Sequence, residues 1–253
     1  GHGRLADFER PRLRHASYVR AAYDKYVLAT CPPDANSHAR VLPDSFEGSN
    51  DAAWRVLLGR RGFRNPDLAV GLLREFVEGS GRTHVAPRTG ELGLRLIPRF
   101  LSRCEADPAA GRLSDPDRVL ARLDSFIGAY RARAPLYELW DSRPALFDLL
   151  LALFDRSEHL AEMAIRAPDL MEELLEAGRL RRAKTAAETL KELRFGAGDA
   201  NQPAWIRRYH QAEQLRIGLR SIVGITDFEQ AGVELTALAE ACLQYAGETA
   251  ARL

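Results

Sequence analysis

The chain has 253 residues, of which 46% are hydrophobic and 28% charged, so it is long enough to bury a sizeable apolar core. Its 36 basic and 35 acidic residues leave a formal net charge of +1. This balance argues against a global field that would attract nucleic acid or an anionic membrane. We therefore expect no nucleic-acid partner and no membrane partner.

The three cysteines, Cys31, Cys104 and Cys242, are too far apart and too few for a disulfide framework or a paired metal-ligand motif. They favour a reducing compartment, and we expect a cytoplasmic protein.

The longest apolar run, LFDLLLALF at 146–154, is too short to span a bilayer. The sequence begins GHG without a methionine or a signal peptide, so we expect a piece of a longer polypeptide.

Helix signals recur along the first half of the chain. Residues 5–29 place apolar side chains near one stripe and predict a long opening helix, whereas the Pro-rich stretch 30–50 predicts a loop. Two short helices follow, the second with Asn65 as N-cap and Pro66 as its first residue. Residues 84–106 continue in helical register, although Pro98 should kink that helix or divide it.

The second half repeats one start signal, a small or capping residue shortly before a proline, at 114–133, 142–156 and 167–178. After a Gly-rich loop at 196–203, two longer helices are expected at 204–224 and 226–246, the second with a capping box of Thr226 and Glu229.

No segment alternates as a strand does, so we predict an all-α fold: an irregular, elongated array of short antiparallel helices without a sheet. We divide it into 1–50, the tail of a preceding domain; 51–140, a central helical linker domain; and 141–253, a helical segment leading into a further domain.

The candidates for chemistry have simple structural interpretations. The stretch 78–84 has glycines but lacks the Lys and the preceding strand of a phosphate-binding loop. Asp115 and Asp117 are explained by a helix cap and a first-turn acid. Cys31 and His38 lack the further ligands that a closed zinc site needs.

Charged pairs and aromatic residues are also interpreted structurally. His159 with Glu162, and His210 with Glu213, are expected to be solvated helical pairs. The basic run could meet an acidic partner, but is more simply a solvated helix end; it comprises Arg179, Arg181, Arg182 and Lys184. Large apolar side chains are expected in the core: Trp54, Phe63, Trp140, Phe147, Phe154 and Trp205. We assign no catalytic, cofactor-binding or metal-binding residue.

Several segments, taken in order, resemble the glutamine synthetase adenylyltransferase family. The segments 58–76, 96–104 and 115–127 look like that family's linker between two catalytic halves, and 147–178 with 207–246 resemble the helices before its second nucleotidyltransferase core. The residues that carry the second likeness are Ser157, Leu160, Ala161, Pro168, Leu170 and Leu174, then Leu215, Arg216, Asp227, Leu235, Leu238 and Ala239. The stretches 31–50 and 196–203 match nothing in the family.

The resemblance implies a parent enzyme in which two nucleotidyltransferase domains add AMP to a tyrosine of glutamine synthetase and remove it. It also implies ATP and Mg²⁺ in the parent, none in this chain, and control by glutamine and the PII signal protein. The parent chemistry needs a Gly-Ser turn followed by Asp-x-Asp on a strand. Gly48 and Ser49 lack that continuation, and Asp115–Asp117 encloses a proline before a helix.

The resemblance therefore implies a non-catalytic central helical region that spaces the active sites and relays regulation between them. The helix pair at 213–245 would then pack on a nucleotidyltransferase core. The alternative is a freestanding helical adaptor that binds a partner through a groove. A hydrolase would need a nucleophile and base, and the sequence offers no such pair.

Overall fold

The computed structural model describes residues 43, 46, 50–79, 85–105, 112–176, 180 and 182–251. Every regular element in these ranges is an α-helix except for single turns of 3₁₀-helix, which confirms the all-α prediction. None of the described helices has both the length and the apolar character needed to cross a membrane. The predicted opening helix at 5–29 and most of the predicted loop at 30–50 lie outside the described residues.

The chain forms two compact units, 1–166 and 167–253. We call them unit 1 and unit 2. The division at residue 140 that the sequence suggested concerns role rather than compactness, and it stays a prediction.

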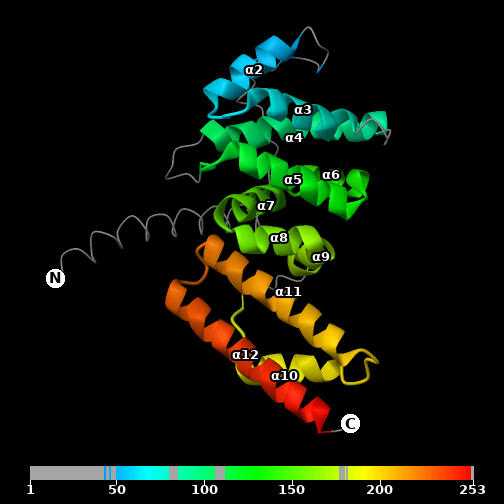
Figure 1. Cartoon of the computed structure of the whole chain (residues 1–253), viewed down its shortest axis with the longest axis vertical. Coiled ribbons are helices and arrows are strands. Elements are labelled where there is room, and N and C mark those ends of the chain that lie inside the picture. Colours follow the sequence, from blue (N-terminus) through cyan, green and yellow to red (C-terminus); the bar gives the residue numbers. More distant parts are fainter. Residues whose placement is uncertain are drawn as a thin grey trace, which may run out of the picture. The chain divides into compact units, whose positions relative to one another are not determined.

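Unit 1 is a succession of helices in which each one packs on helices that lie one to three places away along the chain (Figure 1). α3 lies between α2 and α4, and α5 contacts α3, α7 and α8. Its described helices are α2 (Asp51–Arg60), α3 (Pro66–Glu78), α4 (Pro87–Glu105), α5 (Pro116–Tyr130), α6 (Arg133–Ser142), α7 (Pro144–Arg156) and α8 (Glu158–Arg166).

The starts of α3 and α5 in unit 1 have a side-chain N-cap followed by proline. The Asn65 side chain accepts a hydrogen bond from the Leu68 N–H at 3.2 Å, and Pro66 is the first residue of α3. A single helix, α4, runs through Pro98, so of the two alternatives, a kink or a division, the division is wrong. Buried side chains before and after the proline hold both halves of α4 against the core, and this burial offsets the backbone hydrogen bond that proline cannot make.

An aromatic cluster forms the core of unit 1. The Trp140 ring centroid lies 5.0 Å from that of Phe147 and 5.7 Å from that of Tyr137, and Phe126 contacts both Trp140 and Phe154. The Tyr137 hydroxyl donates to the Phe76 carbonyl at 2.8 Å, so the buried phenol is hydrogen-bonded. The predicted core residues Trp54, Phe63, Trp140, Phe147 and Phe154 are all buried.

Unit 2 contains α9 (Asp169–Glu176), α10 (Ala186–Phe195), α11 (Gln202–Ile222) and α12 (Phe228–Ala250). α12 packs along both α10 and α11 (Figure 1). Two small apolar clusters sit at these contacts, one of Leu190, Leu193, Ala241 and Tyr245, and the other of Ile217, Ala231 and Leu238.

Trp205, also predicted for the core, is partly buried against the first of these clusters. Its indole Nε1 donates to the Leu193 carbonyl at 3.0 Å, across the turn between α10 and α11. Gly196 lies so close to the indole that a Cβ there would overlap the ring. This turn therefore requires glycine for close approach.

The cap of α12 differs from the prediction. Asp227, not Thr226, is the N-cap, and its carboxylate accepts from the Gln230 N–H at 2.8 Å. Thr226 is buried one residue before this N-cap, so the predicted capping box with Glu229 does not form. A true capping box begins α10, where Thr185 and Glu188 satisfy each other's backbone N–H groups. Asp227 caps α12 because a carboxylate one residue later is at least as good an acceptor as the threonine hydroxyl.

Candidate functional site

The Asp-x-Asp sequence at 115–117 has a structural role. The Asp115 carboxylate caps α5 by accepting from the Arg118 N–H at 3.1 Å. The Asp117 carboxylate accepts from the backbone N–H groups of Arg64 and Asn65 at 2.7 and 3.1 Å, and so ties α5 to the start of α3. Both carboxylates are therefore engaged by backbone donors. Across the part of the chain that the structure describes, no three His, Cys, Asp or Glu side chains gather as metal ligands.

Other sequence candidates fall partly outside the described ranges. The candidates outside the described residues are Cys31, His38, Gly48, Ser49, residues 80–84, Arg179 and Arg181. Cys104 is buried in unit 1, and burial raises the pKa of its thiol to about 12, so the thiol is protonated near neutral pH and is a poor nucleophile. The exposed Glu162 pairs with Arg166 at 2.9 Å, as expected for a solvated helical residue.

Glu213 corrects the sequence interpretation. It is buried at 4% exposure rather than solvated, and it belongs to a connected set of charged side chains in unit 2. We call this set the ionic network; its members are Lys184, Glu192, Glu213, Arg216, Arg220 and Glu234.

Arg216 is the centre of the ionic network. Its side chain is 1% exposed, its Nε lies 2.7 Å from Glu213 Oε2, and its Nη2 lies 2.8 Å from Glu234 Oε2. Arg220 Nε lies 3.2 Å from the other oxygen of Glu234. The two arginines of α11 thus hold the carboxylate of Glu234, which comes from α12. Burial disfavours the charged form of Arg216, but the two carboxylates outweigh burial and raise the pKa of its guanidinium.

The same network fastens the segment before α10 to the helices. Arg216 donates to the Arg182 carbonyl and Arg220 to the Leu180 carbonyl, both at 2.8 Å. Lys184, with 14% of its side chain exposed, lies 2.7 Å from Glu213 and 2.6 Å from Glu192. Lys184 is therefore not part of a solvated helix end, as the sequence suggested, whereas Arg182 is exposed and pairs with Glu188.

The sequence does contain a signal for the ionic network, but the helical spacing of the charged residues is not enough to recognise it. Glu213, Arg216 and Arg220 are spaced three and four residues apart on one face of α11, as in ordinary surface pairs. The neighbouring Leu215 and Leu219 are both fully buried. A helix that is apolar on more than one side is buried on those sides, and charged residues between them are then buried as well.

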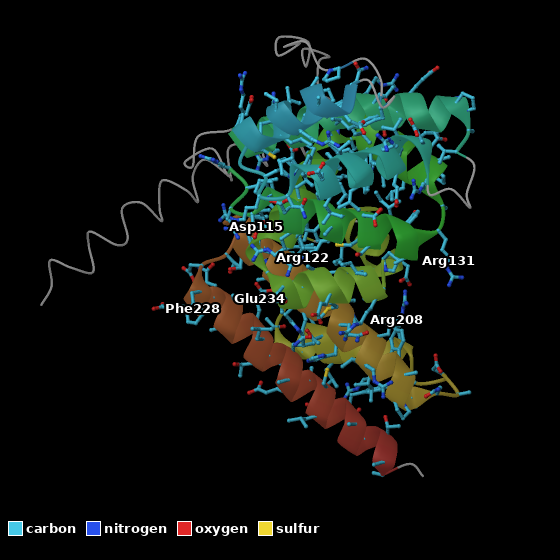
Figure 2. All side chains as sticks on the ribbon, turned by 45° about the horizontal axis from the view of Figure 1, so that its top comes forward. Asp115, Arg122, Arg131, Arg208, Phe228 and Glu234 are labelled. Atoms are coloured by element: carbon cyan, nitrogen blue, oxygen red, sulfur yellow. The ribbon has the colours of Figure 1, made fainter. Side chains whose placement is uncertain are left out.

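α12 presents two very different faces. Its inner face carries Glu234, Leu238, Ala241 and Tyr245, all buried. A second face is exposed and apolar; Phe228 is 77% exposed and Leu243 is 75% exposed. In Figure 2, Phe228 and Glu234 lie on different sides of the α12 ribbon. We call the second face the α12 stripe; it consists of Phe228, Leu235, Ala239, Leu243 and Ala246.

The α12 stripe is regular. Its members are separated by seven, four, four and three residues, which places them within about 80° around the helix axis. Val233 is also exposed, but it lies about 80° beyond the nearest stripe residue. Glu229 and Glu240 are exposed on that same side of the stripe. α12 contains four glutamates and neither lysine nor arginine.

Comparison with known proteins places this geometry in a family context. Residues 147–252 match the family model described as glutamate-ammonia ligase adenylyltransferase. Bifunctional glutamine synthetase adenylyltransferase/adenylyl-removing enzymes are similar over most of the chain. The enzyme of Thioalkalivibrio sulfidiphilus is 26% identical over 96% of this chain and 26% of its own length, and that of Pseudomonas aeruginosa is 30% identical over 83% and 20%.

The chain is related to the glutamine synthetase adenylyltransferases. This finding confirms the resemblance that the ordered sequence segments predicted, and the matched region contains both the ionic network and the α12 stripe. The enzyme of Xanthobacter autotrophicus is a further relative, 28% identical over 89% of this chain and 22% of its own length. The chain thus spans about a quarter of the length of the curated relatives that it matches.

Proposed function

We propose that the chain is a non-catalytic helical region of a glutamine synthetase adenylyltransferase. The observation that carries this proposal is the family match over 147–252, a segment in which every described helix is held by packing and ion pairs rather than arranged around a reaction centre. The structural roles of Asp115 and Asp117 support it, because the one Asp-x-Asp sequence of the chain serves to join helices.

In this proposal the parent polypeptide adds AMP to a tyrosine of glutamine synthetase and removes it, and so controls nitrogen assimilation in the cytoplasm. ATP and Mg²⁺ act in its nucleotidyltransferase domains, and glutamine and the PII signal protein regulate it. The helical region spaces the two catalytic domains and carries regulatory signals between them. The helices α11 and α12 pack on a nucleotidyltransferase core.

AMP transfer by the isolated chain tests the proposal directly. The chain is incubated with labelled ATP, Mg²⁺ and glutamine synthetase, beside the full-length polypeptide that its gene encodes. We expect labelled tyrosine only with the full-length protein, because two metal-binding carboxylates are needed to hold the triphosphate. Product that depends on the isolated chain would disprove the non-catalytic role.

A freestanding helical adaptor is the second candidate, and the exposed α12 stripe is the observation that favours it. The natural reading frame separates the two. A frame that encodes nucleotidyltransferase domains beside this region supports the adenylyltransferase, and a frame limited to the helical region supports the adaptor.

A further inference from the structure

The α12 stripe is an unusual surface for a helix whose other face is so well packed. Five members at helical spacing form one continuous band, and two of its large side chains are at least three-quarters exposed. Single exposed apolar residues are common on protein surfaces, but a continuous band of them marks an interface. The rest of α12 is fixed in place, since Glu234 and Tyr245 anchor it from the opposite direction. The stripe is thus displayed on a rigid helix.

Charge defines what fits the stripe. Glu229 and Glu240 are exposed beside it, and α12 offers no basic side chain to offset them. An interface with an apolar centre and an acidic rim is complementary to an apolar surface with a basic rim. A second copy that pairs through its own α12 does not meet this requirement, because that helix carries four glutamates and neither lysine nor arginine to form a basic rim.

We propose that the α12 stripe docks against an apolar, basic-rimmed surface of another domain in the same adenylyltransferase polypeptide. This inference rests on the proposed function. Its relatives are about four times as long as the matched region, so such a domain is present at high effective concentration beside α12. Docking there transmits movement of that domain to Glu234, and through Glu234 to the two arginines of α11. The stripe and the ionic network thus form the two sides of one connecting helix.

Side-chain footprinting with hydroxyl radicals tests the docking in the full-length polypeptide against the isolated chain. We expect modification of Phe228 and Leu243 to fall about fivefold or more in the full-length protein, because contact excludes solvent from the stripe. Phe195, which is as exposed as Phe228 but belongs to α10, serves as the internal control and should change less than about twofold. Equal modification of Phe228 in both proteins would overturn the inference.

Matched variants separate the stripe from general damage to the helix. In the full-length protein, Leu235→Asp with Leu243→Asp should return Phe228 to the modification rate of the isolated chain, and Phe195→Asp on α10 should not. Glu229→Lys with Glu240→Lys should have the same direction of effect if the partner rim is basic. Protection of Phe228 that survives the charge reversal would overturn the partner chemistry. Each variant is first checked for unchanged protection of α11, which shows that unit 2 is folded.

Three further outcomes show which proposal has failed. If the isolated chain forms a dimer in light scattering and loses it with the two Asp substitutions, the occupant is a second copy and the inference is wrong. If the full-length protein protects Phe228 but does not transfer AMP to glutamine synthetase, the proposed function fails while the docking of the stripe stands. If it transfers AMP but leaves Phe228 unprotected, the docking fails while the proposed function stands.

Discussion

Unit 1 and unit 2 build helical arrays of similar elements around different interiors. In unit 1 an aromatic cluster and aliphatic side chains fill the core, and Arg95 and Arg99 form exposed to half-buried pairs with Asp141 and Asp148. In unit 2 an arginine with 1% exposure lies between helices and binds two buried carboxylates. Pairs of arginine with Asp or Glu thus join α4 to α6 and α7 near the surface of unit 1, and join α11 to α12 in the interior of unit 2.

The difference between the two units shows that burial decides how strongly the loss of one ion-pair partner affects stability. Exposed pairs contribute little because water and salt screen them, whereas a buried charge without its partner is costly. The ionic network therefore mainly selects one arrangement of α10, α11 and α12. It contributes less to the net free energy of unfolding. We expect removal of an arginine to destabilise unit 2 much more than unit 1.

The largest expected effect is that of Arg216→Met. It leaves two buried carboxylates without their central cation, so we expect unit 2 to lose about 3–5 kcal/mol of unfolding free energy. The matched control is Arg95→Met in unit 1, where the bidentate pair with Asp141 is more than a third exposed on both sides and should contribute at most about 1 kcal/mol. Hydrogen exchange of the full chain in increasing urea reports each unit separately. Equal losses of unfolding free energy in the two units would contradict the distinction between a buried and an exposed ion pair.

Tyr137→Phe sharpens the comparison from the other side. The substitution keeps the ring in the aromatic core but removes the hydroxyl that binds the buried Phe76 carbonyl, and we expect a loss of about 1–3 kcal/mol confined to unit 1. Exchange rates of α11 and α12 serve as the reference and should stay constant. A shift in unit 2 of the same size would show that the two units unfold as one.

The smallest effect concerns the start of α12. Asp227→Ala removes the observed cap and should cost unit 2 about 0.5–2 kcal/mol, while Glu229→Ala should be nearly neutral. Amide exchange in the first turn of α12 checks both variants. A larger loss from Glu229→Ala than from Asp227→Ala would show that α12 begins with the capping box that the sequence suggested.

The all-α class and most helix starts were predictable because they depend on local chemistry. Asn65 followed by Pro66 supplies an N-cap acceptor and a fixed φ within two residues, and no distant contact is needed to interpret them. Pro98 shows the limit of such rules, since packing on both sides of it decides that α4 continues. The family resemblance came from the order of many weak matches rather than from one motif.

The ionic network was not predictable from spacing. Glu213 at one helical spacing from Arg216 has the pattern of a surface pair, and only the packing of α12 shows that both are buried. The sequence Thr-x-x-Glu also stands near the start of two helices, at 185–188 and 226–229, and forms a capping box only at the first. At the second position Asp227 competes for the same N-cap role, and the two local signals are equally good without the structure.

The buried charges of unit 2 also bear on its behaviour with temperature. Unfolding of an apolar core raises the heat capacity, whereas exposure of polar surface lowers it. The aromatic interior of unit 1 therefore gives a strongly curved dependence of stability on temperature, and the ionic interior of unit 2 gives a flatter one. Because the desolvation penalty of ion pairs also falls on warming, α10, α11 and α12 retain their arrangement over a wider thermal range than an apolar core of the same size would.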